Sequence, residues 1–203
     1  ENIVHFVLAR LPESPVGTRG ISLFLVPKYH VNGDGELGER NDVRLVGLNH
    51  KMGYRGSVNA VMEFGDSGPC VGHLLGAPHQ GLRYMFHMMN EARVGTGLAS
   101  AATAYAAHRH AVDYARSRPQ GFKPGERDQS KPEVMIIEHA DVRRMLLQQK
   151  AYIEGSLHLV LYCAKLMDQH EIAKHAEDEK APELDMLLAL LTPIAKAWVS
   201  EYC

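Results

Sequence analysis

The residues best suited to chemistry in this sequence lie in one short segment with helical spacing. Residues 84–92 read Tyr-Met-Phe-His-Met-Met-Asn-Glu-Ala, and Arg93 follows at once. A wide apolar wall beside one fixed cation suits a ligand with an apolar tail and an anionic head. The alternative is that Met85, Phe86 and Met89 are core residues and that the arginine is an ordinary surface charge.

A second group of candidates is basic and lies further along the chain. Arg109, Arg116 and Arg118 crowd the end of the same predicted helix, and Arg143 and Arg144 begin the next one. A guanidinium fork matches the oxygens of a pyrophosphate or a phosphate. The alternative is a solvated, charged helix face.

The remaining reactive side chains predict no metal site and no nucleophile. His108 and His110 are two positions apart, so they do not share a helical face. His87 and Glu91 could share one, but no third ligand stands at a defined place. Cys163 lies on an apolar helical face and is interpreted as a core residue. Phosphate-binding and dinucleotide-binding glycine motifs are absent, so any nucleotide is bound by another geometry.

Composition places the chain among ordinary globular proteins. It has 203 residues, of which 45% are hydrophobic and 23% charged, and a formal net charge of −2. This balance offers no basic field for nucleic acid, and no apolar run is long enough to span a membrane. Three scattered cysteines and the lack of a signal peptide predict a cytoplasmic protein.

The first third of the sequence predicts antiparallel strands. They are expected near residues 3–9, 21–26, 43–48 and 58–64, with turns at 32–35 and 51–57. No crossover helix separates the strands, so they must pair antiparallel. Both ends of the chain interrupt predicted elements, and we therefore expect an internal fragment of a longer protein.

The rest of the sequence predicts three helices. The first covers about residues 82–118 and would be roughly 55 Å long, so a bend is expected near Gly95–Gly97. The second carries an apolar stripe from Val142 to Ala164, and residues 168–180 are expected to form a solvated linker. The third begins with Pro182 in its first turn. The predicted fold class is α+β, with an antiparallel β portion in residues 1–78 and part of an antiparallel helical bundle in residues 79–203.

Several short segments, each modest alone, occur in a specific order and spacing. They include Lys-Met-Gly-Tyr-Arg-Gly-Ser at residues 51–57 and Tyr-Ala-Arg-Ser-Arg at residues 114–118. Together they resemble the acyl-CoA dehydrogenase family, flavoproteins that oxidise the Cα–Cβ bond of acyl-CoA thioesters. The resemblance covers essentially the whole chain. The matching segments are 19–27, 51–57, Phe64, Gly76, Gly81, Arg93, 114–118 and 194–197.

Longer blocks are similar to a subgroup of large bacterial members that includes 3-(methylthio)propanoyl-CoA dehydrogenases. These blocks are residues 48–56, 84–93 and 136–146, and the insert at 120–132 also fits. The resemblance implies that residues 1–78 belong to the middle β domain of such a protein. Residues 79–203 would then belong to its C-terminal α-helical domain.

The resemblance assigns the substrate contacts to Asn90 and Arg93. Arg93 would lie near the bound acyl-CoA, with Asn90 one turn before it, where the family often has aspartate. The resemblance also implies the partners, which are an acyl-CoA substrate, an electron-transfer acceptor and further copies of the protein in a dimer or tetramer.

The resemblance assigns FAD contacts to three residues around the end of the first helix. Arg118 matches an arginine that contacts FAD, typically the FAD held mainly by a neighbouring subunit. Gln120 takes the place of a usual threonine contact. His139 matches the histidine of a His-Gln pair near the flavin, but Ala140 replaces the glutamine.

No catalytic base is assigned within this chain. The reaction needs a carboxylate to remove the α-proton while the β-hydride passes to the flavin. In most relatives this glutamate lies after the third helix, here beyond Cys203, and in some it lies where this chain has Ala92. Glu91 points about 100° away from that position and is interpreted as a surface residue. The chain alone is expected to show no turnover. An acyl-CoA oxidase-like flavoenzyme and a catalytically inactive helical-bundle binding protein stay open as alternatives.

Overall fold

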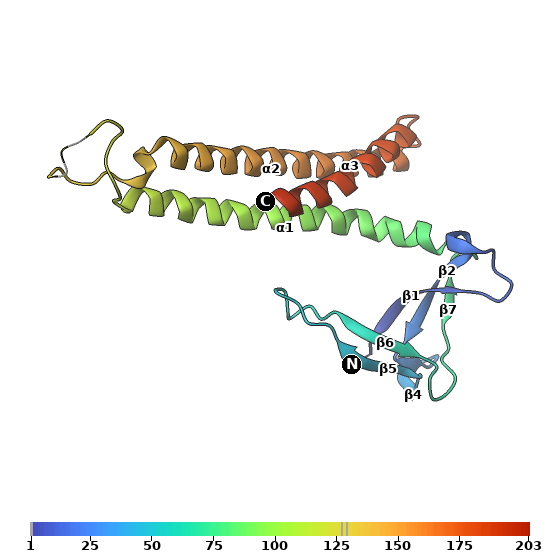
Figure 1. The fold of residues 1–203 in the computed structure, drawn as a ribbon. Helices are drawn as coiled ribbons and strands as arrows, with labels where there is room; N and C mark the ends of the chain where they lie inside the picture. Colours follow the sequence, from blue (N-terminus) through green and yellow to red (C-terminus); the bar gives the residue numbers. More distant parts are fainter. Residues whose placement is uncertain (1, 127, 129) are drawn as a thin grey trace. The chain divides into compact units, whose positions relative to one another are not determined.

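The computed structural model describes residues 2–126, 128 and 130–203. It divides into two compact units, Glu1–His87 and Met88–Cys203. All the strands lie in the first unit and most of the helical residues in the second (Figure 1), which confirms the predicted α+β class. The domain boundary expected after residue 78 stays a prediction. The boundary between the two compact units lies after His87. The first turn of the long helix belongs to the β unit because it packs on the sheet, where a Cβ on Gly81 would lie 2.4 Å from the carbonyl carbon of Ser22.

The β unit is built from antiparallel pairs, as the sequence predicts. One sheet has the strand order β1-β2-β7, and β3 pairs with β4 and β5 with β6. The predicted strands correspond to β1, β2, β5 and β6, whereas β3, β4 and β7 were not predicted because each is only three or four residues long. The bounds are β1 (Val4–Arg10), β2 (Ile21–Pro27), β3 (Tyr29–Val31), β4 (Leu37–Arg40), β5 (Val43–Leu48), β6 (Ala60–Phe64) and β7 (His73–Leu75).

A buried asparagine holds the parts of this unit together. Asn41 is 1% exposed. Its side-chain amide donates to the carbonyl oxygens of Pro27 and Val71, both at 2.9 Å, and its Oδ1 accepts from the backbone N–H of Val71 at 2.9 Å. Both donor hydrogens and the acceptor are therefore used, as burial of an amide requires. The contacts fix the segment before β7 against the end of β2.

The neighbouring Asp42 is expected to make stability depend on acid pH. Its Oδ2 accepts backbone N–H bonds from Ser67 at 2.7 Å and Gly68 at 2.8 Å. These two bonds are the main cause that holds the pKa of Asp42 below its ordinary 3.8. A lowered pKa in the folded state stabilises above pH 3.8, and this contribution is lost as the pH falls through the folded-state pKa. We expect the free energy of unfolding of Asp42→Asn to fall less steeply with decreasing acid pH than that of the wild-type protein. Parallel curves for the variant and the wild-type protein would contradict this.

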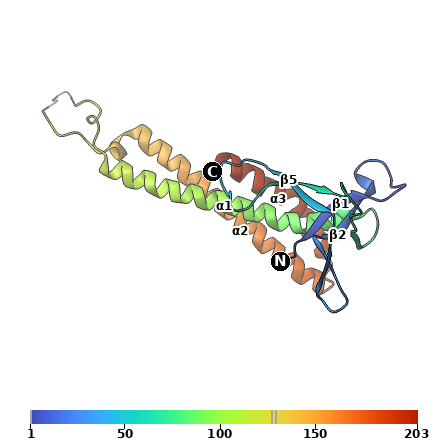
Figure 2. The same cartoon turned by 90° about the horizontal axis from the view of Figure 1, so that it is seen from below.

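The second unit is a bundle of three helices, two of them long. Figures 1 and 2 show α1 and α2 running antiparallel, connected at one end beyond Ser117, with α3 against them. The linker predicted at 168–180 is wrong, because α2 continues to His175 and buries Ala173 in its last turns. Only residues 176–180 connect it to the next helix. The helix bounds are α1 (Gly81–Ser117), α2 (Ala140–His175) and α3 (Ala181–Tyr202), with short 3-10 helices at Gly17–Gly20 and Ile136–Glu138.

All three helices contribute to one hydrophobic core. Its buried members are Val94 and Ala101 from α1, Val160 and Cys163 from α2, and Ala195 and Val199 from α3. α1 is helical throughout, including Gly95 and Gly97. A Cβ placed on Gly97 would lie only 2.7 Å from the carbonyl oxygen of Ala195, so the missing side chain lets α1 and α3 approach closely. Within the described residues, no helix combines the length and apolar character needed to cross a bilayer.

Candidate functional site

The two predicted substrate contacts lie together on α1, one turn apart. The Nη1 of Arg93 donates to Oδ1 of Asn90 at 3.1 Å. The same Oδ1 lies 3.4 Å from the hydroxyl oxygen of Thr192 on α3. Asn90 and Arg93 are half-buried, whereas Thr192 is 0% exposed. We call Asn90, Arg93 and Thr192 the helix cluster. It presents a cation that donates one hydrogen bond to an asparagine carbonyl.

Thr192 was not predicted as a site residue, although the sequence carries a signal for it. The buried residues of α3 are Leu188, Thr192, Ala195 and Val199. Their spacing of four, three and four positions marks a single helical face. Among these four side chains the threonine is the one with a polar atom, and a buried polar group needs a partner. A hydroxyl on an otherwise apolar face was therefore the signal that could have drawn attention to this position.

The apolar wall predicted before Arg93 is exposed in this chain. Phe86 is 42% exposed, Met88 40% and Met89 39%. The alternative that treats Phe86 and Met89 as core residues is therefore wrong here, and Met85 is half-buried. Glu91 is exposed, in agreement with its interpretation as a surface residue. An apolar surface thus precedes the guanidinium along α1.

The three predicted FAD contacts are brought together by the loop that joins α1 to α2. The Arg118-Pro119 step ends α1 as predicted, and the chain then returns alongside itself. The backbone N–H of Gln120 donates to the carbonyl of Val134 at 2.9 Å, and the N–H of Ile136 donates to that of Arg118 at 2.9 Å. This pairing sets His139, at the start of α2, beside Gln120. We call Arg118, Gln120 and His139 the loop cluster.

The ring of His139 is oriented by the backbone of Gln120. Its Nε2 lies 2.7 Å from the Gln120 carbonyl oxygen. A carbonyl only accepts hydrogen bonds, so Nε2 carries the proton and Nδ1 of the neutral ring is an acceptor. Gly121 follows with a φ of 72°, a conformation that favours glycine, and a Cβ there would lie 3.7 Å from the His139 ring. The local backbone thus fixes both the place and the tautomer of this imidazole.

The loop cluster lies at an end of the helix pair that carries charges of both signs. Arg118 and Arg116 are exposed and have no ion-pair partner in the part of the chain that the structure describes. Lys123, in contrast, lies 3.2 Å from Glu138, and Arg144 lies 2.8 Å from Asp141. Arg143, at the start of α2, is likewise exposed without an ion pair among the described residues. A carboxylate is also close, because Glu133 accepts from the backbone N–H of Gly121 at 3.2 Å. Guanidinium groups in such a setting suit phosphate oxygens.

The helix cluster and the loop cluster lie far apart in one chain. Arg93 and Arg118 are separated by 25 positions along α1 and its last turn. At about 1.5 Å per residue this separation is roughly 37 Å. The two guanidiniums therefore cannot act on the same atoms of one ligand within one chain.

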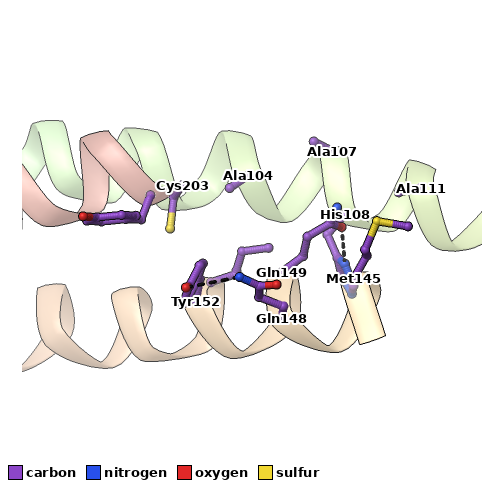
Figure 3. A pocket seen from close by; sticks show the side chains of 11 residues that line it. Ala104, Ala107, His108, Ala111, Met145, Gln148, Gln149, Tyr152 and Cys203 are labelled. Atoms are coloured by element: carbon purple, nitrogen blue, oxygen red, sulfur yellow. Dashed lines mark hydrogen bonds between the residues drawn. The ribbon is translucent and has the colours of Figure 1, made fainter. Parts of the chain in front are cut away.

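A groove between α1 and α2 is distinct from both clusters (Figure 3). It has a volume of about 500 Å³ and is lined on one side by the small side chains of Ala104, Ala107 and Ala111. On its walls Nδ1 of His108 lies 3.2 Å from Oε1 of Gln149. None of the five predicted site residues lines it, so it does not serve as the predicted ligand site.

Other reactive side chains offer no further centre among the described residues. No group of three or more His, Cys, Asp or Glu side chains in residues 2–126, 128 and 130–203 is arranged to hold a metal ion. Cys163 is 0% exposed and belongs to the core, as predicted. Its burial raises the pKa of the thiol, which disfavours the reactive thiolate.

Comparison with known proteins identifies the family of this chain. Residues 79–201 match the family described as acyl-CoA dehydrogenase, C-terminal domain. The chain is 42% identical to 3-methylmercaptopropionyl-CoA dehydrogenase of Ruegeria pomeroyi, over 99% of this chain and 33% of that protein. It is 40% identical to a butyryl-CoA dehydrogenase of Syntrophomonas wolfei, again over 99% of this chain and 33% of that protein.

A solved structure supports the fold alone. ACDH-11 of Caenorhabditis elegans in complex with C11-CoA superposes with a TM-score of 0.69 at 23% identity, over 97% of this chain and 30% of that chain. The chain spans about one third of the length of the curated relatives it matches. Because the family match covers more than half of its residues, the chain belongs to the acyl-CoA dehydrogenase family.

Proposed function

We propose that this chain is part of a longer FAD-dependent acyl-CoA dehydrogenase that oxidises the Cα–Cβ bond of an acyl-CoA thioester to a 2,3-enoyl-CoA. The observation that carries the proposal is that the matched segment, residues 79–201, contains both clusters. The names of the two bacterial relatives support an acyl-CoA as the class of substrate.

The helix cluster is proposed to bind the acyl-CoA. The Arg93 guanidinium supplies positive charge and several N–H donors, and Asn90 holds one of its nitrogens at 3.1 Å. The exposed apolar side chains that precede it supply a surface for an acyl chain, since methionine adapts to apolar ligands of varied shape. Together they recognise a ligand that is apolar at one end and polar at the other.

The loop cluster is proposed to hold part of an FAD. Its donor set fits the group: an exposed guanidinium for phosphate oxygens, the Gln120 amide, and an imidazole whose tautomer is fixed by the backbone. When bound, FAD supplies the two-electron acceptor for the oxidation. The roughly 37 Å between Arg93 and Arg118 along the helix favours an arrangement in which the loop cluster serves the FAD of a neighbouring subunit. A homo-oligomer, dimer or tetramer, is therefore part of the proposal.

The catalytic base is proposed to lie outside these 203 residues. Removal of the α-proton needs a carboxylate within hydrogen-bond reach of it. Position 92 is alanine in this chain, and Glu91 is exposed on a different face of α1. The chain therefore contributes binding and orientation, while another segment removes the proton. The electron-transfer acceptor and the cytoplasmic location stay predictions.

The test of this function is the activity of the full-length protein. We expect it to purify with bound FAD and to reduce a flavin-linked dye when given butyryl-CoA or 3-methylmercaptopropionyl-CoA, whereas the 203-residue chain alone shows no turnover. A colourless full-length protein that takes up no FAD and reduces no dye would support the inactive binding protein instead. Peroxide formation in aerobic turnover would identify an acyl-CoA oxidase.

A further inference from the structure

We propose that Thr192 is a positioning residue for acyl-CoA binding, acting on Arg93 through Asn90. The inference rests on the proposed role of Arg93 as a substrate contact. It adds a residue on α3 to a site that is otherwise built on α1. Thr192 does not touch the ligand in this proposal; it fixes the side chain that orients the guanidinium.

The geometry joins the three side chains through a single acceptor atom. Oδ1 of Asn90 lies 3.1 Å from Nη1 of Arg93 and 3.4 Å from Oγ1 of Thr192. The Thr192 hydroxyl also lies 2.9 Å from the carbonyl oxygen of Leu188, one turn earlier on α3. The one hydroxyl hydrogen is thus shared between two acceptors or alternates between them. The contact keeps Oδ1 facing α3, which limits the rotamers open to Asn90.

Close packing holds the two helices at the distance this contact needs. Two turns further along α1, the absent side chain of Gly97 allows the Ala195 carbonyl to approach, since a Cβ there would lie 2.7 Å from that oxygen. Val94 lies between these two contacts and is buried in the core. Side chains in a core packed this densely cannot shift independently, so the separation of Asn90 and Thr192 is constrained. Burial of Thr192 also keeps water from competing for its hydroxyl.

Other threonines in the bundle show what a purely local hydroxyl does. Thr96 donates to the Ala92 carbonyl at 2.8 Å and Thr103 to the Ala99 carbonyl at 2.9 Å, and both are exposed. Each makes the usual bond to the carbonyl four residues earlier. Thr192 makes this bond as well, but its hydroxyl also reaches a side chain on another helix. Thr103→Val is therefore a control for loss of this local bond alone, because Thr103 is exposed whereas Thr192 is buried.

The test uses the full-length FAD-containing protein with butyryl-CoA and 3-methylmercaptopropionyl-CoA as substrates. Valine keeps the shape of threonine and removes the hydroxyl. A hydrogen bond contributes a factor of roughly two to ten, so we expect Thr192→Val to raise the KM by about that factor with kcat nearly unchanged. Thr192→Ser should restore the KM, and Thr103→Val should leave both constants at wild-type values. In an Asn90→Ala background, Thr192→Val should add little, because the two residues act through one contact.

Two outcomes would overturn the inference, and they are distinguishable. If Arg93→Ala leaves the KM unchanged, the proposed role of Arg93 fails and the inference fails with it. If Arg93→Ala raises the KM but Thr192→Val does not, only the positioning role of Thr192 is lost. An equal rise for Thr192→Val in the wild-type and Asn90→Ala backgrounds also rejects it, since a general loss of packing would act in this additive way. Thermal unfolding of each variant identifies such packing losses.

Discussion

Replacing Gly97 by valine is expected to destabilise the helical unit by about 3 kcal/mol, because at this position the backbone of α3 packs directly against α1. A Cβ at Gly97 would lie 2.7 Å from the backbone oxygen of Ala195 and 3.1 Å from Cγ2 of Val160. A flexible side chain could move aside at little cost, but the first of these atoms belongs to the backbone of α3. The helices would have to separate and loosen the core formed by their buried side chains. Glycine's lower helix propensity, at most about 1 kcal/mol, does not offset this effect.

Gly95→Val provides the matched control on the same helix. No heavy atom lies within 4 Å of a Cβ placed on Gly95, and the residue is exposed. The same substitution two positions away should therefore change stability by less than about 0.5 kcal/mol. Denaturant unfolding of the 203-residue chain or its full-length parent measures the difference in stability between the two variants. The comparison holds when the slope of the unfolding free energy against denaturant concentration is the same for both. Equal losses of stability for the two variants would show that the close approach at Gly97 is not what matters.

The sequence predicted the elements whose patterns are long enough to read. β5 was expected at residues 43–48 and lies there, and α1 differs from its predicted range by one residue at each end. The helical spacing of apolar residues and the Arg118-Pro119 step are strong local signals, because both act through the backbone geometry of neighbouring residues. The antiparallel pairing also followed from the absence of crossover helices. In each case the information lay within a short stretch of chain.

What the sequence did not predict depends on contacts between distant segments. The end of α2 reads as a polar linker, but Leu166 and Ala173 are buried and continue the helix to His175. The strands β3, β4 and β7 are too short to alternate visibly. The place of His139 beside Gln120 follows from pairing between residues 118–121 and 134–136, which no local pattern announces. Tertiary contacts thus decided each of these features.

The candidate site shows the same division. Asn90 and Arg93 were assigned by the family resemblance, and their spacing of three positions on a helix explains why the two side chains meet. The loop cluster was assigned by resemblance, and the structure supplies the backbone pairing that brings its members together. Thr192 stands 102 positions away from Asn90 in the sequence, and only the packing of α3 against α1 reveals their contact. Motifs therefore gave the local parts of the site, while its rigidity came from the fold.

Because the two clusters lie far apart, substitutions of Arg93 and Arg118 are expected to affect different ligands of the full-length protein. Arg93→Ala is expected to weaken acyl-CoA binding roughly 100-fold, or about 3 kcal/mol, because a charged donor is lost and Oδ1 of Asn90 loses one of its two donors. Arg93→Lys should recover only part of this loss, since an ammonium lacks the planar fork of the guanidinium. FAD content should be unchanged in both variants. Equilibrium titration with butyryl-CoA and flavin absorbance measure the two quantities separately.

Arg118→Ala is expected to show the reverse pattern. Loss of a guanidinium for phosphate oxygens should lower the affinity for FAD by roughly tenfold or more, while the reconstituted protein keeps its affinity for acyl-CoA. Because Arg118 is exposed and has no ion-pair partner among the described residues, its removal leaves no buried charge behind, and folding should be unaffected.

Mixing Arg118→Ala and Arg93→Ala subunits then tests the oligomer. If the loop cluster of one subunit serves the FAD of another, some sites in the mixed protein combine an intact Arg93 with an intact Arg118 from the neighbour. The expected result is an activity of the mixed protein above the sum of the activities of the two separate variants. An activity equal to that sum would mean that each arginine acts only in the site of its own chain.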